Sequence, residues 1–154
     1  YGTEALGVLR IEKGHVAGNE LSGQTTAQDL GLGRMASARK DFIGRAMAGR
    51  PALVHPDRPC LVGFKPTNAS QRLRAGAHFI ARGQDARMDA DEGYMTSVAY
   101  SPHLGHWIGL GLLVRGRTRI GERLRAYDPV RQGDIEVEVC SPVFIDPEGT
   151  RLHG

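Results

Sequence analysis

Cysteine and long hydrophobic runs are both scarce in this sequence. Only two of its 154 residues are cysteine, Cys60 and Cys140. Two are too few for a disulfide framework and are typical of reduced thiols in a cytoplasmic protein. The longest apolar run, residues 108–114, is far shorter than the ~18–20 residues that span a bilayer. No secretory signal is visible at the first residues. We therefore expect a cytoplasmic protein with no membrane contact.

Aromatic residues are also few, at 6% of the chain, and the basic residues behind its net charge of +3 are scattered. Nucleic-acid-binding modules combine a basic stripe with interleaved aromatic side chains or a recognisable motif. Neither is present, so we expect no nucleic-acid partner. A modest positive field suits a small polyanionic ligand instead.

Metal-ligating patterns are nearly absent as well. His103 and His106 have a spacing that can hold zinc on a helix, but strand-like runs flank them and no third ligand stands near. We therefore predict no metal site. The cysteines and histidines form no recognisable nucleophile-and-base motif, and we assign no catalytic residue to this chain.

The first fifty residues contain residues that typically begin and end short helices. Three are predicted there, over residues 3–13, 25–30 and 41–48. Thr3 is the expected N-cap of the first, which Gly14 ends, and Asp41 is the expected N-cap of the third. Gly7 is unfavourable inside a helix by ~1 kcal/mol, which predicts a close neighbour at that position.

After Pro51 the pattern changes to short apolar or alternating runs with turn residues between them. Strands are predicted over residues 60–64, 78–81, 94–100, 108–114, 123–127, 135–140 and 143–145. Strands at this spacing without helices between them indicate a small antiparallel barrel or sandwich. We therefore expect a mainly β protein with a few short helices and a boundary near residue 50.

Several stretches, in order, resemble the glycine-cleavage T-protein (aminomethyltransferase) family. Residues 9–14, LRIEKG, and residues 40–44, KDFIG, resemble its "LRLExG … DFIG" segment. Residues 93–110, with their Thr-Ser and Ser-Pro pairs, resemble a hairpin of its C-terminal barrel. The resemblance implies the tail of the family's folate-binding middle domain over residues 1–50. A small, jelly-roll-like antiparallel β-barrel is implied over residues 51–154.

Within this family, residues 1–15 are similar to the alpha subunits of heterotetrameric sarcosine oxidases. That similarity implies a carboxyl-terminal portion that binds tetrahydrofolate, the acceptor of the one-carbon unit released when sarcosine is oxidised. It also implies that FAD, FMN and NAD are bound elsewhere in the full complex. The expected partners are the other oxidase subunits and the missing N-terminal part of the same subunit. A fragment that lacks the family's activating aspartate should be inactive alone.

Glu12 and Arg39 are the folate-binding residues that the resemblance implies. One carboxylate can accept both the 2-amino group and N3–H of a pterin, and a basic residue suits the carboxylates of the glutamate tail. The other interpretations are a helix-end glutamate paired with Lys13, Arg10 or solvent, and a solvated arginine. Because the helix dipole disfavours a negative charge at its last turn, we expect a hydrogen-bond donor beside Glu12. Arg10 is expected to tie neighbouring loops together.

Two other functions remain open from the sequence. One is a fragment of an aminomethyltransferase of the glycine-cleavage type, which would need a lipoyl-carrier partner. The other is a non-catalytic barrel that binds partner subunits.

Overall fold

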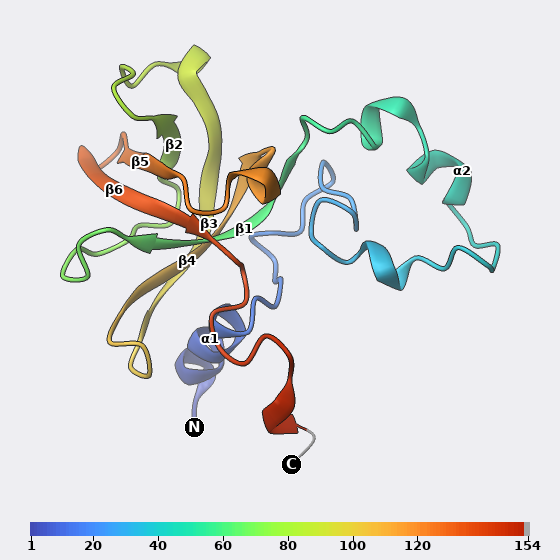
Figure 1. Cartoon of the computed structure of the whole chain (residues 1–154), viewed down its shortest axis with the longest axis horizontal. Coiled ribbons are helices and arrows are strands. Elements are labelled where there is room, and N and C mark those ends of the chain that lie inside the picture. The colour runs from blue at the N-terminus through green and yellow to red at the C-terminus, as the bar shows by residue number, and fades with distance from the viewer. Residues whose placement is uncertain (153–154) are drawn as a thin grey trace.

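A six-stranded barrel with one regular helix beside it dominates the computed structural model, which describes residues 1–152 (Figure 1). The helices are α1 (Thr3–Glu12) and α2 (Arg45–Ala48), and the 3-10 helices are η1 (Gly33–Met35), η2 (Pro51–Leu53), η3 (Met88–Ala90), η4 (Gly116–Arg119) and η5 (Thr150–Leu152). The strands are β1 (Pro59–Pro66), β2 (His78–Ala81), β3 (Asp91–Ser101), β4 (His106–Val114), β5 (Arg123–Asp128) and β6 (Gly133–Cys140).

The strands close into an antiparallel barrel in the order β1-β4-β3-β2-β5-β6, which confirms the predicted fold class. Alternation along the strands explains which side chains fill the barrel, because successive side chains point to opposite faces. In β6, for example, Val137 and Val139 are fully buried, and they alternate with Glu136 and Glu138, which are partly exposed. The barrel interior is therefore filled by one side of each strand.

Strand β4 is buried on both faces, which accounts for its unbroken apolar run. On one face, Ile108, Leu110 and Leu112 belong to a hydrophobic cluster. Helix α1 contributes Ile11 to the same cluster. Two glycines, at 109 and 111, alternate with these β4 residues. Gly109 leaves room for the side chains of Met95 and Leu73, and Gly111 leaves room for the aromatic pair in the barrel, Phe64 and Phe79. Those rings stack with their centroids 4.0 Å apart. Glycine is thus required where β4 crosses the aromatic core.

Alanine at Gly111 is expected to destabilise the fold by about 1–3 kcal/mol, the usual result of overpacking a core. A Cβ there would lie 2.8 Å from the Phe64 ring and 2.9 Å from the Phe79 ring. Gly7→Ala is the matched control. Nothing lies within 4 Å of a Cβ at Gly7, so the close neighbour predicted from the sequence is wrong. This control should stabilise α1 by up to about 1 kcal/mol. Urea denaturation measures both changes, and a neutral Gly111→Ala would contradict the packing account.

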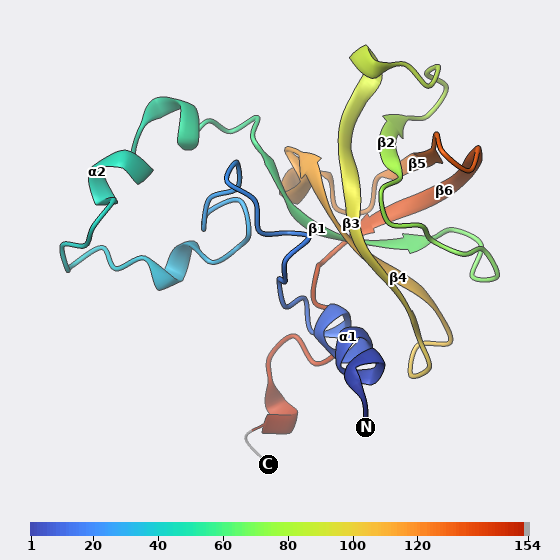
Figure 2. The same cartoon turned by 180° about the vertical axis from the view of Figure 1, so that it is seen from behind.

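Helix α1 lies against the outside of the barrel and beside the C-terminal tail of the chain (Figure 2). The main-chain oxygen of Glu12 accepts hydrogen bonds from Phe144 N at 2.9 Å and from Ile145 N at 3.1 Å. Gly14, with φ +70°, ends the helix as predicted, and a Cβ there would lie 2.6 Å from Pro142 O. The end of α1 is therefore held by the tail as well as by the barrel.

Four local predictions are wrong. Gly2, not Thr3, is the N-cap of α1, and it makes no side-chain capping bond. Residues 27–30 form hydrogen-bonded turns rather than a helix. Gly44, not Asp41, precedes α2, and its φ of +94° prevents the helix from starting earlier. Residues 143–145 form no strand, because the tail donates its N–H groups to the end of α1 instead of to a neighbouring strand.

Candidate functional site

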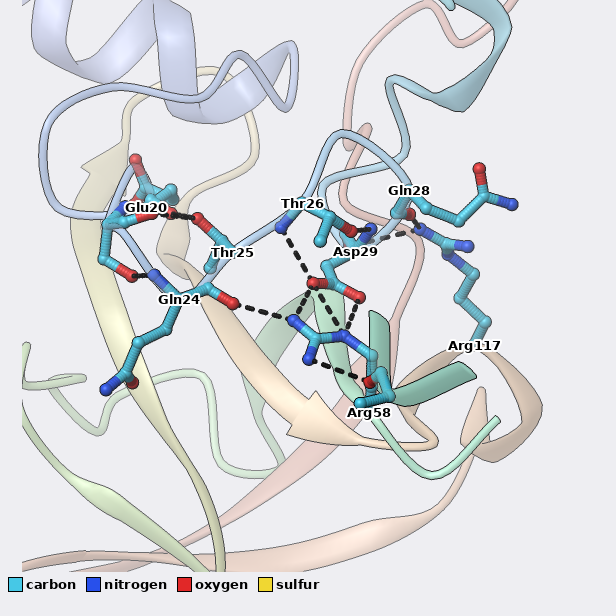
Figure 3. Close-up of polar contacts among 10 residues, drawn as sticks. Glu20, Gln24, Thr25, Thr26, Gln28, Asp29, Arg58 and Arg117 are labelled. Carbon is cyan, nitrogen blue, oxygen red and sulfur yellow. Dashed lines mark hydrogen bonds and ion pairs between the residues drawn. The ribbon is translucent and has the colours of Figure 1, made fainter. Parts of the chain in front are cut away.

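Two buried carboxylates, Glu20 and Asp29, fasten the segment after α1 to the barrel (Figure 3). Glu20 has no exposed surface. Its Oε1 accepts hydrogen bonds from Thr96 Oγ1 at 2.6 Å and from Ser97 Oγ at 2.5 Å. Its Oε2 accepts hydrogen bonds from the main-chain N–H of Ala17 at 2.8 Å and from Arg10 Nη1 at 3.0 Å. The carboxylate is thus satisfied by hydroxyl, amide and guanidinium donors at once.

A β-bulge makes this arrangement possible. Thr96 and Ser97 are consecutive, and in a regular strand their side chains would point to opposite faces. The register of β3 against β4 shifts between Met95 and Ser97, which breaks the alternation. Both hydroxyls can therefore reach the same oxygen of Glu20.

Arg10 completes the network from α1. Its Nη2 donates to Ser97 Oγ at 2.7 Å and its Nη1 to His15 O at 3.3 Å, in addition to the ion pair with Glu20. The tying role predicted for Arg10 is thereby confirmed. Burial by itself would raise the pKa of Glu20, but the hydrogen bonds from Ser97 and Thr96 and the charge of Arg10 outweigh it. The pKa of Glu20 therefore lies below its ordinary 4.5, and the group is ionised at neutral pH.

Asp29 forms the second anchor. The Arg58 guanidinium donates to its carboxylate from Nε at 3.0 Å and from Nη2 at 2.6 Å, a two-pronged ion pair. Thr26 N also donates to Asp29 Oδ2, at 2.9 Å. Burial would raise the pKa of Asp29, yet the hydrogen bonds from Arg58 and Thr26 hold that pKa below 3.8. The main-chain oxygen of Asp29 accepts from Leu61 N and from Arg117 Nη2, which joins this turn to β1 and η4.

Glu12 is buried against the barrel, with 7% of its surface exposed. Its Oε1 accepts a hydrogen bond from Ser101 Oγ at 2.5 Å, and Ser101 Oγ in turn accepts one from Leu104 N at 3.1 Å. The donor expected from the helix dipole is therefore Ser101. Within residues 1–152, no hydrogen bond reaches the second oxygen of Glu12, and every fully buried side-chain polar atom has a partner. That second oxygen consequently keeps contact with solvent.

Arg39 is exposed and belongs to the segment between η1 and α2, which projects away from the barrel (Figure 1). Its main-chain N–H donates to Ser37 Oγ at 3.2 Å. The structure does not bring Arg39 and Glu12 together.

A cleft of about 450 Å³ lies next to the Asp29 anchor. Residues 22–25 form one wall of this cleft, Leu53 and Arg58 a second, and Tyr94 and Leu112 of the barrel the third. The side chain of Tyr94 is 38% exposed there. Such a mixed polar and apolar cleft can hold a small planar ligand with polar groups at its edge.

Of the residues considered for metal or thiol chemistry, Cys60 lies near the Asp29 anchor, where the main-chain N–H of Arg117 donates to its Sγ at 3.3 Å. Among residues 1–152, no three metal-ligating side chains are grouped. Both cysteines are free, and burial raises the pKa of Cys140 to about 12, which keeps it a protonated, weakly nucleophilic thiol. None of the helices in the same described range has the length and hydrophobicity that a bilayer crossing requires.

Three anchoring residues, Glu20, Asp29 and Arg58, were not singled out from the sequence. For Asp29 the sequence does contain a signal, because Thr26 lies three residues before it and this spacing is typical of a capped turn. Glu20 lies in a polar loop and has no such signal, because its partners at 96 and 97 come from a distant strand.

The chain belongs to the glycine cleavage T-protein family, because residues 60–146 match the model described as "Glycine cleavage T-protein C-terminal barrel domain". Over 99% of its length it is 49% identical to a protein named sarcosine oxidase subunit alpha from Rhizobium meliloti (strain 1021). The chain spans 16% of the length of that relative.

More distant relatives have another name. The chain is 32% identical over 93% of its length to an aminomethyltransferase from Saccharopolyspora erythraea, of which it covers 37%. Its fold is similar to the crystal structure of glycine cleavage system aminomethyltransferase T from Bartonella henselae, with a TM-score of 0.74 and 24% identity. That similarity extends over 92% of this chain and 38% of that one.

Proposed function

We propose that this chain is the part of a sarcosine oxidase alpha subunit that helps to bind tetrahydrofolate. The observation that carries the proposal is the 49% identity, over 99% of the chain, to a protein named sarcosine oxidase subunit alpha. When bound, tetrahydrofolate supplies the amine that takes up the one-carbon unit of oxidised sarcosine as 5,10-methylenetetrahydrofolate. The residues of this chain would orient the folate, which is a proximity effect.

The proposal places the remaining chemistry outside this chain. FAD, FMN and NAD would be bound by other parts of a cytoplasmic complex, whose other subunits and whose remaining alpha-subunit polypeptide are the partners. Residues 1–50 would belong to the folate-binding domain and residues 51–154 to the barrel domain. Residues 1–154 alone should show no turnover.

Glu12 and Arg39 are the folate-binding residues in this proposal. For Glu12, the hydrogen bond from Ser101 fixes the orientation of the carboxylate, and its second oxygen is left to accept from the pterin edge. Arg39 is exposed and is offered as a contact for the carboxylates of the glutamate tail.

Glu12→Gln in the intact enzyme tests the site. The amide keeps an acceptor for Ser101 but removes the charge, so we expect the Kd for tetrahydrofolate to rise about ten-fold, the effect of losing one charge-assisted hydrogen bond. Flavin reduction by sarcosine should be unchanged. Titration of tetrahydrofolate and stopped-flow absorbance at the flavin measure the two effects separately.

Glu148→Gln, at an exposed position of the tail, is the matched control and should change neither quantity. Equal losses of folate binding and flavin reduction in Glu12→Gln would show that Glu12 only anchors α1 to the barrel. Unchanged folate affinity would remove Glu12 from the site.

An aminomethyltransferase of the glycine-cleavage type is the second candidate, because a protein with that name is 32% identical to the chain. Transfer of a lipoyl-bound aminomethyl group to tetrahydrofolate by the intact protein, without sarcosine oxidation, would favour it. A protein with neither activity would favour a barrel that only binds subunits.

A further inference from the structure

Residues 141–152, which we call the tail, pass beside the last turn of α1 (Figures 1 and 2). The last carbonyl oxygens of a helix have no partner within the helix, and such ends fray unless something holds them. Here the tail supplies two donors, because Phe144 N and Ile145 N both donate to Glu12 O. Glu12 is the last residue of α1. The tail therefore fixes the main chain of the residue whose carboxylate the proposed function uses.

The tail is itself attached to the barrel. The side chain of Phe144 packs against the hydrophobic cluster that contains Ile11 and Leu110. Strand β1 makes room for the tail at Gly63, where a Cβ would overlap Ser141 O and the Phe144 ring. The barrel consequently holds the tail in place, and the tail in turn holds the end of α1.

One ion pair joins the first residue after α1 to the tail. Lys13, the C-cap of the helix, donates from Nζ to the main-chain oxygen of Asp146 and to Asp146 Oδ2, the latter at 3.2 Å. The side chain of Lys13 is 28% exposed and that of Asp146 is 10% exposed. Lys13 follows Glu12 directly in the chain, so this pair restrains the helix end one residue away from the Glu12 carboxylate.

Asp146 has a conformation that suits this contact. Its φ of +49° lies in the left-handed region, which is uncommon for a residue other than glycine. Its Oδ1 accepts hydrogen bonds from Thr150 N at 2.9 Å and from Thr150 Oγ1 at 2.8 Å. The hydrogen bonds from Thr150 and Lys13 hold the pKa of Asp146 below its ordinary 3.8, so the group is ionised at neutral pH. Thr150 thus orients the carboxylate, and Oδ2 faces Lys13.

We infer that Lys13 and Asp146 are positioning residues for Glu12, because their ion pair fixes the end of α1 and so places the Glu12 carboxylate for folate. The inference rests on the proposed function, since it requires Glu12 to be a folate ligand. Ser101 orients the carboxylate from the barrel, and the tail fixes the main chain. A carboxylate that is held in this way loses less freedom when the ligand binds, which is the advantage of preorganisation.

Two substitutions in the intact enzyme test the inference by the sign of their effects. Lys13→Met removes the cation, and Asp146→Asn removes the anion but keeps an acceptor for Thr150. We expect each to raise the Kd for tetrahydrofolate about three-fold, part of the roughly ten-fold effect of losing the Glu12 charge. Direct attraction between Lys13 and the anionic folate tail would instead make Asp146→Asn lower the Kd, because the cation would be freed. A lower or unchanged Kd in Asp146→Asn would overturn the inference.

Lys65→Met is the matched control, because Lys65 of β1 also belongs to a partly exposed ion pair, at 3.0 Å from Glu138. This control should leave the Kd unchanged. A rise equal to that of Lys13→Met would show that the loss of any such pair weakens binding, and would overturn the inference.

A double-mutant cycle determines whether Lys13 acts through Glu12. In a Glu12→Gln background, Lys13→Met should change the Kd by less than about 1.5-fold, because the bonds that depend on the position of the carboxylate are already lost. Independent, multiplying effects would overturn the inference and leave the folate site in place. An unchanged Kd in Glu12→Gln alone would remove the folate site and this inference together.

Hydrogen exchange of the intact enzyme without folate gives a readout that does not depend on the ligand. The amides of Phe144 and Ile145 should exchange faster in Lys13→Met and in Asp146→Asn than in the unmodified enzyme, because the contact between the tail and Glu12 O is loosened. Unchanged exchange at both amides would mean that the ion pair does not hold the helix end, and would overturn the inference.

Discussion

Replacing Glu20 with alanine is expected to lower the free energy of unfolding by about 3 kcal/mol, at the lower end of the range for breaking a buried ion pair. The lower end applies because Arg10 is 22% exposed and can recover part of its solvation. The loss also leaves the hydroxyls of Thr96 and Ser97 without their shared acceptor. Loop 15–25 would consequently detach from the β3 bulge while the barrel interior stays packed.

Urea denaturation of the 154-residue chain measures this effect, with Glu148→Ala as the control. Glu148 is exposed, and a surface change of this kind stays within about 0.5 kcal/mol. A Glu20→Ala variant as stable as its control would mean that the buried carboxylate contributes nothing to folding.

The same residue predicts a pH dependence. Since the folded-state pKa of Glu20 lies below 4.5, its stabilising contribution is fully present above pH 4.5 and is lost as the pH falls through the folded-state value. Glu20→Gln, which cannot ionise, should therefore lose less stability than the unmodified chain between about pH 5 and pH 3. Asp29 also has a lowered pKa and contributes in the same direction, so the variant should retain part of the slope.

Arg58→Ala is expected to have the next largest effect and to lower the free energy of unfolding by about 2–3 kcal/mol. Asp29 is only 5% exposed, and the substitution removes the cation that pairs with its buried carboxylate. The loss should be local. Hydrogen exchange of backbone amides should accelerate in residues 24–57, the segment that the Asp29–Arg58 pair holds at its base, while β5 and β6 stay protected.

Arg123→Ala is the matched control for that experiment. The side chain of Arg123 is 55% exposed, and its Nη1 lies 3.8 Å from Glu136 Oε2. Such a long ion pair at the surface contributes little to stability. Faster exchange throughout the barrel in Arg58→Ala would indicate that the ion pair supports the whole fold. Unchanged exchange in residues 24–57 would indicate that the pair does not hold this segment at its base.

The strands could be predicted because each carries its own pattern. Apolar and acidic residues alternate strictly from Ile135 to Val139, and this stretch forms β6, which pairs with β1 and with β5. The number and spacing of such runs indicated a small antiparallel barrel or sandwich, and the resemblance to the T-protein family favoured the barrel that the structure shows. Even the donor beside Glu12 could be expected from the helix dipole, although its identity could not, since Ser101 is 89 residues away in the chain.

What the sequence did not indicate depends on long-range contacts. The polar loop that contains Glu20 looks solvated, and only the bulge in β3 turns two consecutive hydroxyls toward it. Residues 143–145 have the composition of a strand, but the amides of Phe144 and Ile145 donate to Glu12 O instead of to a neighbouring strand. In both places a hydrogen-bond partner that is distant in the sequence decides the local structure.

Closure of the sheet has a further consequence for how this molecule associates. Every strand of the barrel has two hydrogen-bonded neighbours, but the pairing does not extend over the full length of each strand. β1 pairs with β6 only over Gly63–Pro66, and β3 pairs with β2 only at Asp91 and Tyr94. A foreign β-strand could therefore add only at these short unpaired stretches, whereas an open sheet offers a whole edge strand. Association through surface side chains and loops can be altered by substitution without disturbing the backbone ladder.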